Sequence, residues 1–255
     1  MTLGFALGAA RLDRSVSILD ALRPARDLRV LVTAGAGGVG AAIARAFHAA
    51  GSRVHVCDID RSALDRLRAD APAITGSIAD VSLAADVEAV FDDVEAAIGG
   101  LDVLVGNAGI AGPTGPIETI DGAGWERAIA VNVHSQFYFA RRAVPLLKRS
   151  TAAPCLIIAG AVAQRPGDDL HAADASSTWA VVGLMRSLAA ELGPHRIRVN
   201  AILLGTAAER DSGAVASSRA AMVDEAAAIA LFLCSPAARS VTGQTVRLDG
   251  GVASE

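Results

Sequence analysis

A glycine-dense turn between a short apolar run and a helical pattern constrains this chain more than any other feature. It lies in residues 28–51, LRVLVTAGAGGVGAAIARAFHAAG, where residues 30–32 predict a buried strand and the residues after the turn predict a helix. A strand, a glycine turn and a helix in this order present backbone N–H groups to a phosphate, and the helix N-terminus adds about half a positive charge. The candidate phosphate-binding residues are Gly35, Gly38 and Gly40. A close-packed helix–strand turn that binds nothing is the alternative.

Strands and helices alternate from this turn to the end of the chain. Strands are expected at residues 30–32, 53–58, 74–80, 101–105, 155–159, 197–202 and 245–248. Helices are expected at residues 61–71, 82–98, 125–148, 175–192 and 225–234. The alternation predicts an α/β fold, a single-domain Rossmann-like doubly wound parallel sheet with helices on both faces, over residues 28–255. Residues 1–27 form an N-terminal extension, either a surface arm or a contact arm for a partner subunit.

Composition and charge exclude several classes of protein. The chain of 255 residues is 52% hydrophobic, which is enough for one large core, and its formal net charge of −4 argues against a nucleic-acid partner. No apolar run approaches the roughly 20 residues of a membrane span, so no membrane association is expected. The three cysteines, Cys57, Cys155 and Cys234, are far apart and lack metal-ligand spacing, which predicts buried free thiols, no metal and a cytoplasmic location.

Three polar residues follow predicted strands, where ligands bind in open parallel sheets: Asp58, Asp80 and Asn107. Asp58 lies 18 residues after Gly40. In a dinucleotide-binding fold, an acid at this point accepts hydrogen bonds from the adenosine ribose and repels a 2′-phosphate. A helix N-cap or turn aspartate is the alternative, and we favour the ribose role.

From about residue 29 to residue 251 the chain resembles the short-chain dehydrogenase/reductase family. The motifs that carry the resemblance are Thr33–Gly40 (the TGxxxGxG turn, with Ala34 replacing its first glycine), Asp80-Val81, Asn107-Ala108-Gly109, Asn132, residues 184–200 and residues 241–251. The resemblance implies that Gly35, Gly38, Gly40, Asp58, Asp80 and Asn107 are cofactor-binding positions. Asp58, with no basic residue in the turn, implies NAD rather than NADP. Ala34 adds a methyl group to the turn, so we expect NAD binding to be weak or lost.

The catalytic residues of the family are replaced. The family uses a serine to hold the substrate oxygen, a tyrosine as general acid/base, and a lysine four residues later that lowers the tyrosine pKa. A gap-free alignment places Ala161, Asp174 and Thr178 at these positions. An ionised aspartate, with a reference pKa near 3.9, cannot donate a proton at pH 7. We therefore expect no intact catalytic group, although the family asparagine, Asn132, is retained.

Three functions fit these observations. The favoured one is a non-catalytic subunit of a heteromeric NAD-dependent dehydrogenase acting on a hydroxyl or ketone substrate. Its partner would be an active short-chain dehydrogenase/reductase paralogue, or a second copy in a dimer or tetramer, bound through helices 125–148 and 175–192. The resemblance includes such pairs, among them the dehydrogenase for 2-[hydroxy(phenyl)methyl]succinyl-CoA in the benzylsuccinate pathway.

The other two interpretations are a changed enzyme and a regulatory protein. His171 and Asp174 could form a new acid/base pair for proton abstraction, elimination or isomerisation. In the alternative, they belong to a solvated acidic loop that includes Asp168 and Asp169, with Asp174 capping a helix. The third interpretation is a regulatory protein that binds NAD without chemistry.

Overall fold

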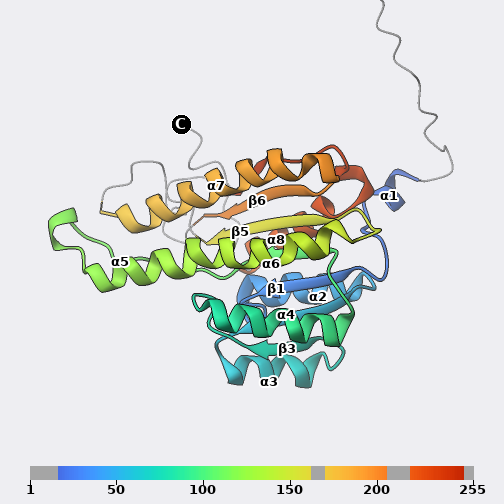
Figure 1. Ribbon diagram of the computed structural model, residues 1–255, viewed down its shortest axis with the longest axis horizontal. Helices are drawn as coiled ribbons and strands as arrows, with labels where there is room; N and C mark the ends of the chain where they lie inside the picture. Colours follow the sequence, from blue (N-terminus) through green and yellow to red (C-terminus); the bar gives the residue numbers. More distant parts are fainter. Residues whose placement is uncertain (1–16, 162–169, 206–218, 250–255) are drawn as a thin grey trace, which may run out of the picture.

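The computed structural model describes residues 17–161, 170–205 and 219–249. At its centre is a seven-stranded parallel sheet with the strand order β3-β2-β1-β4-β5-β6-β7 (Figure 1). The strands are β1 Arg29–Thr33, β2 Arg53–Asp58, β3 Thr75–Ile78, β4 Val103–Gly106, β5 Cys155–Ala161, β6 Arg198–Leu204 and β7 Thr245–Leu248. The strand order reverses between β1 and β4, and in such sheets ligands bind at this point. The predicted Rossmann-like parallel sheet is confirmed.

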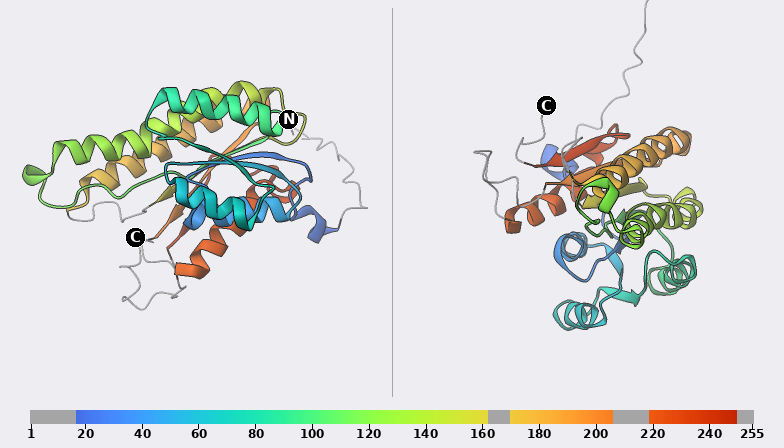
Figure 2. Two further views of the ribbon diagram at one scale, coloured as in Figure 1. Left: turned by 90° about the horizontal axis from the view of Figure 1, so that it is seen from below. Right: turned by 90° about the vertical axis from the view of Figure 1, so that its left-hand side faces the viewer.

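Helices cover both faces of the sheet (Figure 2). The α-helices are α1 Ile18–Ala21, α2 Gly38–Ala49, α3 Arg61–Asp70, α4 Ala84–Ile98, α5 Gly122–Ile129, α6 Ser135–Lys148, α7 Ala172–Leu192 and α8 Arg219–Leu233. Short 3₁₀ turns are η1 Ile117–Thr119, η3 Gly193–His195 and η5 Pro236–Ala238, and η2 Ala130–His134 is a π-helical turn. Buried side chains of α4, α6 and α7 pack on one face, and those of α2, α3 and α8 pack on the other.

The apolar run of β1 shows why the strands carry little alternation. Leu31 packs into the core on the face covered by α4, α6 and α7. Val30 and Val32 point into the core under α2, α3 and α8. All three are fully buried because both faces of the sheet are covered.

Two of the differences from the sequence-based prediction have local reasons. The helix expected over 125–148 is continuous but contains the π-helical turn η2, which holds Asn132. Strand β3 ends at Ile78 rather than at Asp80, because the backbone N–H of Asp80 donates to the carboxylate of Asp86 instead of to a neighbouring strand. Both irregularities lie at positions that the sequence marks as functional. All three cysteines are free and buried, as predicted.

Candidate functional site

The glycines of the turn between β1 and α2 have two distinct roles. A Cβ atom at Gly35 would lie 2.7 Å from the Cβ of Val56, and one at Gly40 would collide with the carbonyl oxygen of Ala34. These two glycines let the turn pack against the sheet. A Cβ atom at Gly37 or Gly38 would meet nothing within 4 Å. The open part of the turn is therefore at the N-terminus of α2, where a phosphate would be held by backbone N–H groups.

Ala34 occupies an unfavourable conformation in this turn. Its φ of 48° lies in the left-handed region, which costs an L-residue roughly 1–2 kcal/mol relative to glycine. The family has glycine at this position, and the left-handed backbone favours glycine here too. The sequence identified Ala34 as an added methyl group, and the structure adds that its backbone is strained.

Asn107 holds the ends of β1 and β4 together. Its side-chain Nδ2 donates to the carbonyl oxygens of Thr33, at 3.1 Å, and Ala34, at 3.2 Å. The Thr33 hydroxyl in turn accepts hydrogen bonds from the backbone N–H groups of Asn107 and Ala108. Asn107 therefore holds the start of the glycine turn in place through its backbone carbonyl groups. A direct contact between Asn107 and a cofactor stays a prediction.

Asp58, at the end of β2, lies beside the glycine turn as predicted. Its Oδ2 accepts a hydrogen bond from the backbone N–H of Ala36 and its Oδ1 accepts one from that of Asp60, each at 3.1 Å. Asp58 also lines a cavity of about 130 Å³ that extends along the carboxyl ends of β2, β3 and β4. The other lining residues are Ala34, Ile59, Ala79, Asp80, Val81, Ala108, Gly109, Ile110, Arg127 and Val131. The cavity brings Asp58 and Asp80 together at the adenosine side expected from the family.

Asp80 forms an ion pair with Arg127 of α5, a residue that the sequence did not mark as part of the site. Its Oδ2 lies 3.1 Å from the Nη2 atom of Arg127, while the Ser82 hydroxyl donates to its Oδ1. Partial burial raises the pKa of Asp80, but the hydrogen bonds from Ser82 and Arg127 and the charge of Arg127 lower this pKa by more. Arg127 is far from Asp80 in the sequence, so only the fold reveals the pair.

Asp174 is a buried hydrogen-bond acceptor in the first turn of α7. It is 4% exposed, and its Oδ1 accepts a hydrogen bond of 2.7 Å from the backbone N–H of Gly112. His171 is the N-cap residue of α7, so the two residues of the predicted acid/base pair both lie at the first turn of this helix. Asp168 and Asp169 lie outside the described residues. Ala161 is the last residue of β5.

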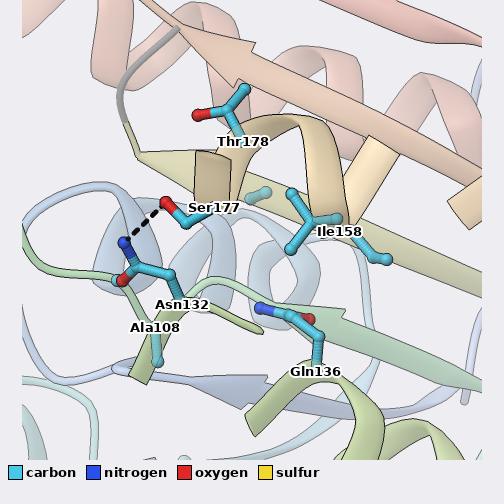
Figure 3. Close-up of a pocket in the computed structure, with 9 residues that line it drawn as sticks. Ala108, Asn132, Gln136, Ile158, Ser177 and Thr178 are labelled. Atoms are coloured by element: carbon cyan, nitrogen blue, oxygen red, sulfur yellow. Dashed lines mark hydrogen bonds between the residues drawn. The ribbon is translucent and has the colours of Figure 1, made fainter. Parts of the chain in front are cut away.

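Asn132 lies at the centre of the candidate catalytic site (Figure 3). Its Nδ2 donates to the Ser177 hydroxyl at 3.2 Å and to the carbonyl oxygen of Ile110 at 2.9 Å. Its Oδ1 accepts the backbone N–H of Ile110. The small cavity here is lined by Ala108, Gly109, Asn132, Gln136, Ile158, Ala159, Ser177, Thr178 and Val181. None of these described lining residues carries an acid/base side chain that works near neutral pH. Nothing in the sequence marked Ser177 as a residue of this site.

The comparisons with known proteins decide the family. Residues 34–253 match the family described as Enoyl-(Acyl carrier protein) reductase. A solved Short-chain dehydrogenase/reductase (Glucose/ribitol dehydrogenase) from Brucella melitensis superimposes with a TM-score of 0.79 at 32% identity, covering 89% of this chain and 97% of that one. The chain belongs to the short-chain dehydrogenase/reductase family.

Curated members of this dehydrogenase/reductase family align over nearly the whole chain. The D-threitol dehydrogenase of Mycolicibacterium smegmatis is 32% identical over 238 residues, which cover 87% of this chain and 91% of that protein. The 2-(S)-hydroxypropyl-CoM dehydrogenase 3 of Xanthobacter autotrophicus is 32% identical over 246 residues, or 88% and 95% of the two chains. A 3-ketoacyl-(acyl-carrier-protein) reductase from Brucella melitensis, solved in complex with NADH, has a TM-score of 0.80 at 26% identity and covers 89% of this chain and 99% of that one.

Three further observations bear on what this short-chain dehydrogenase/reductase contacts. Phe137 on α6 and Trp179 on α7 are 50% and 53% exposed, although both side chains are large and apolar. Residues 17–161, 170–205 and 219–249 include no helix long and apolar enough to cross a bilayer. In the same ranges, no group of three or more His, Cys, Asp or Glu side chains is arranged to hold a metal ion.

Proposed function

We propose that this chain is a non-catalytic subunit of a heteromeric NAD-dependent short-chain dehydrogenase that acts on a hydroxyl or ketone substrate. The observation that carries the proposal is the hydrogen bond between Asp174 and the Gly112 backbone. The position that holds the general acid/base in active relatives is occupied here by the buried carboxylate of Asp174. This carboxylate already accepts a hydrogen bond from a backbone N–H group. Its role is to join α7 to the segment after β4.

The remaining chemistry agrees with this assignment. Hydride transfer to or from a carbon that bears a hydroxyl requires a proton to move at the oxygen. Loss of a positioned acid/base group costs about 10²–10⁴ in rate. Thr178 supplies no cation near the nicotinamide ribose, and Ala161 has no hydroxyl to hold the substrate oxygen. All three changes remove the same reaction and leave the fold intact.

The surface supports assembly with another chain. Helices α6 and α7 present Phe137 and Trp179 to solvent. The Tyr138 ring lies next to those of His134, at the end of η2, and Phe137, in the first turn of α6, and these rings extend this area. Aromatic side chains are enriched at interface centres. We propose that an active paralogue covers this face, with a second copy of this chain as the alternative occupant.

We propose that the chain keeps a weak site for NAD(H). Support comes from the cavity beside Asp58 and Asp80, from the open N-terminus of α2, and from the relative solved with NADH. The strained Ala34 and the replaced lysine weaken such a site. A regulatory protein that binds NAD without chemistry is the second candidate function, and the cavity beside Asp58 is the observation in its favour.

An enzyme that uses His171 and Asp174 is less favoured. The Asp174 side chain is almost completely buried, and its Oδ1 already has a partner. Taking up a proton there would disturb the hydrogen bond to Gly112. Substitution of Asp174 by Asn and of His171 by Ala tests this function directly, because an acid/base pair would lose turnover.

The experiment for the proposed function is co-purification from the native source with the full chain tagged at its N-terminus. We expect a short-chain dehydrogenase with intact Ser, Tyr and Lys to be recovered, and its NAD-dependent turnover to rise when the untagged chain is added. The chain alone should not reduce NAD⁺ with secondary alcohols. Turnover by the purified chain alone that vanishes in Asp174→Asn would overturn the proposal.

A further inference from the structure

A further cavity lies between α7 and the edge strand β7. It has a volume of about 180 Å³ and is lined by Thr178, Trp179, Val182, Arg186, Leu203, Thr245 and Arg247. Thr178 also lines the degenerate catalytic cavity, so the two spaces adjoin.

The strand that borders the cavity carries two hydrogen-bonding groups without partners. Thr245 and Arg247 are two residues apart on β7, so their side chains share one face, while Leu248 packs into the core on the other. Within the described residues, the Thr245 hydroxyl and the Arg247 Nη2 are buried and have no hydrogen-bond partner. An unpaired buried polar group of this kind costs roughly 1–3 kcal/mol, so two on one face of a strand indicate a missing acceptor.

The charge of the cavity is positive. Asp249 accepts a hydrogen bond of 2.8 Å from the Nε atom of Arg247 and balances that cation. Arg186, on α7, also lines the cavity, and its side chain is exposed. The second guanidinium leaves the cavity with an excess positive charge and with donors on both sides.

The other walls are apolar. Val182 and Leu203 are buried, and the Trp179 indole forms a flat surface beside them. Cavities of about 150 Å³ lined by aliphatic and aromatic side chains hold a six-membered ring, so there is room for one ring with a small substituent. A guanidinium fork suits a carboxylate better than a neutral oxygen.

We propose that this cavity binds a small ring-bearing carboxylate, with its carboxylate toward Thr245, Arg247 and Arg186 and its ring against Trp179. The site requires neither NAD nor a partner chain, but it shares Trp179 with the face that we propose a paralogue covers, so binding is measured on the separate chain. It adjoins the position of the lost lysine, so a ligand here would lie next to the degenerate site rather than inside it.

Trp179 reports directly on binding. The chain has two tryptophans, so Trp125→Phe leaves Trp179 as the only indole. The probe is sodium benzoate, and benzyl alcohol is its neutral match. For a ligand of nine heavy atoms we expect saturable quenching of Trp179 with a Kd of roughly 1 mM. Benzyl alcohol should bind at least tenfold more weakly, because it lacks the charge that the guanidinium groups recognise.

Matched variants separate this site from non-specific binding. Thr245→Val preserves side-chain shape and Arg247→Gln removes the fork, and each should weaken benzoate binding about tenfold or more. Arg196→Gln, which removes an exposed cation beyond the other end of α7, should leave the Kd unchanged. Equal binding of benzoate and benzyl alcohol, unchanged affinity in Thr245→Val and Arg247→Gln, or no saturable quenching would each overturn the proposal. Thr245→Val keeps the test decisive if Arg247→Gln does not fold.

Discussion

The Oδ1 atom of Asp174 lies 2.7 Å from the backbone nitrogen of Gly112 and joins the first turn of α7 to the segment that follows β4. In active members of the family, the side chain at this position of α7 faces the substrate. Here it faces the protein's own backbone. Asp174, at the position that aligns with the family's general acid/base, therefore supplies a structural contact between α7 and the segment after β4.

Substitution of Asp174 should reveal this structural role. Asp174→Ala leaves the half-buried Gly112 N–H without its acceptor, so we expect the free energy of unfolding to fall by about 1–3 kcal/mol. Asp174→Asn keeps an oxygen acceptor and should cost less than about 1 kcal/mol. Urea denaturation of the two variants measures the difference. Equal stability of the two variants would show that the hydrogen bond contributes nothing.

Ala34→Gly should stabilise the protein. The left-handed φ of 48° disfavours alanine, and glycine relieves about 1 kcal/mol of that cost. The midpoint of urea unfolding should rise, and calorimetry should detect tighter NAD(H) binding. Ala36→Gly is the matched control, since Ala36 lies in the same turn without a positive φ. That control should be destabilised by roughly 0.5–1 kcal/mol.

Asp58→Ala tests the adenosine side of the weak NAD(H) site. If the carboxylate holds the ribose, we expect the Kd for NADH to rise about tenfold, the typical effect of losing a charge-assisted hydrogen bond. Isothermal titration calorimetry gives the Kd, and circular dichroism checks the fold, because Asp58 also accepts the Ala36 N–H. Asp65→Ala, an exposed acid on the neighbouring α3, should bind NADH as the unaltered chain does.

Phe137→Arg should break the proposed assembly without disturbing the fold. Phe137 is half exposed on α6, so an arginine is accommodated in the separate chain. At an interface centre, the change should weaken association by about 2 kcal/mol or more, which is roughly 30-fold in Kd. Sedimentation velocity with the partner chain measures the change. Ile117→Arg, at a 69% exposed residue of η1, serves as the control and should associate normally.

The buried His55 should make the free energy of unfolding decrease as the pH falls below neutrality. Burial lowers the pKa of His55 to about 4, opposed by the charge of Asp93 and assisted by that of Arg68. The neutral ring is held between the hydroxyls of Thr75 and Ser77, each at 2.8 Å. The unfolded chain takes up the proton first, because its histidine titrates near 6.5.

The free energy of unfolding should consequently drop as the pH is lowered from about 6.5 to about 4, by up to about 3 kcal/mol from this residue. Urea denaturation at a series of pH values records the slope. His55→Gln keeps a donor and an acceptor but does not titrate, so its slope over this range should be shallower. An identical slope in the variant would assign the acid sensitivity to other groups.

Much of the fold could be predicted from the sequence because its cause is local. The spacing of apolar residues places each strand and helix within a few residues, and Gly35 and Gly40 mark the turn that must pack tightly. The interpretation that Ala161, Asp174 and Thr178 stand at the family's catalytic positions likewise comes from the sequence, since it needs only an alignment within one family, and it stays a prediction.

Only the tertiary structure decided what those residues do. The tether from Asp174 to Gly112, the ion pair of Arg127 with Asp80 and the contact of Asn132 with Ser177 each join segments 45 or more residues apart. The same holds for the cavity that brings Arg186 opposite Arg247. Hydrophobic periodicity reports which face of an element is buried. It does not report which polar groups meet across elements, because those contacts depend on the register of the sheet and the packing of helices upon it.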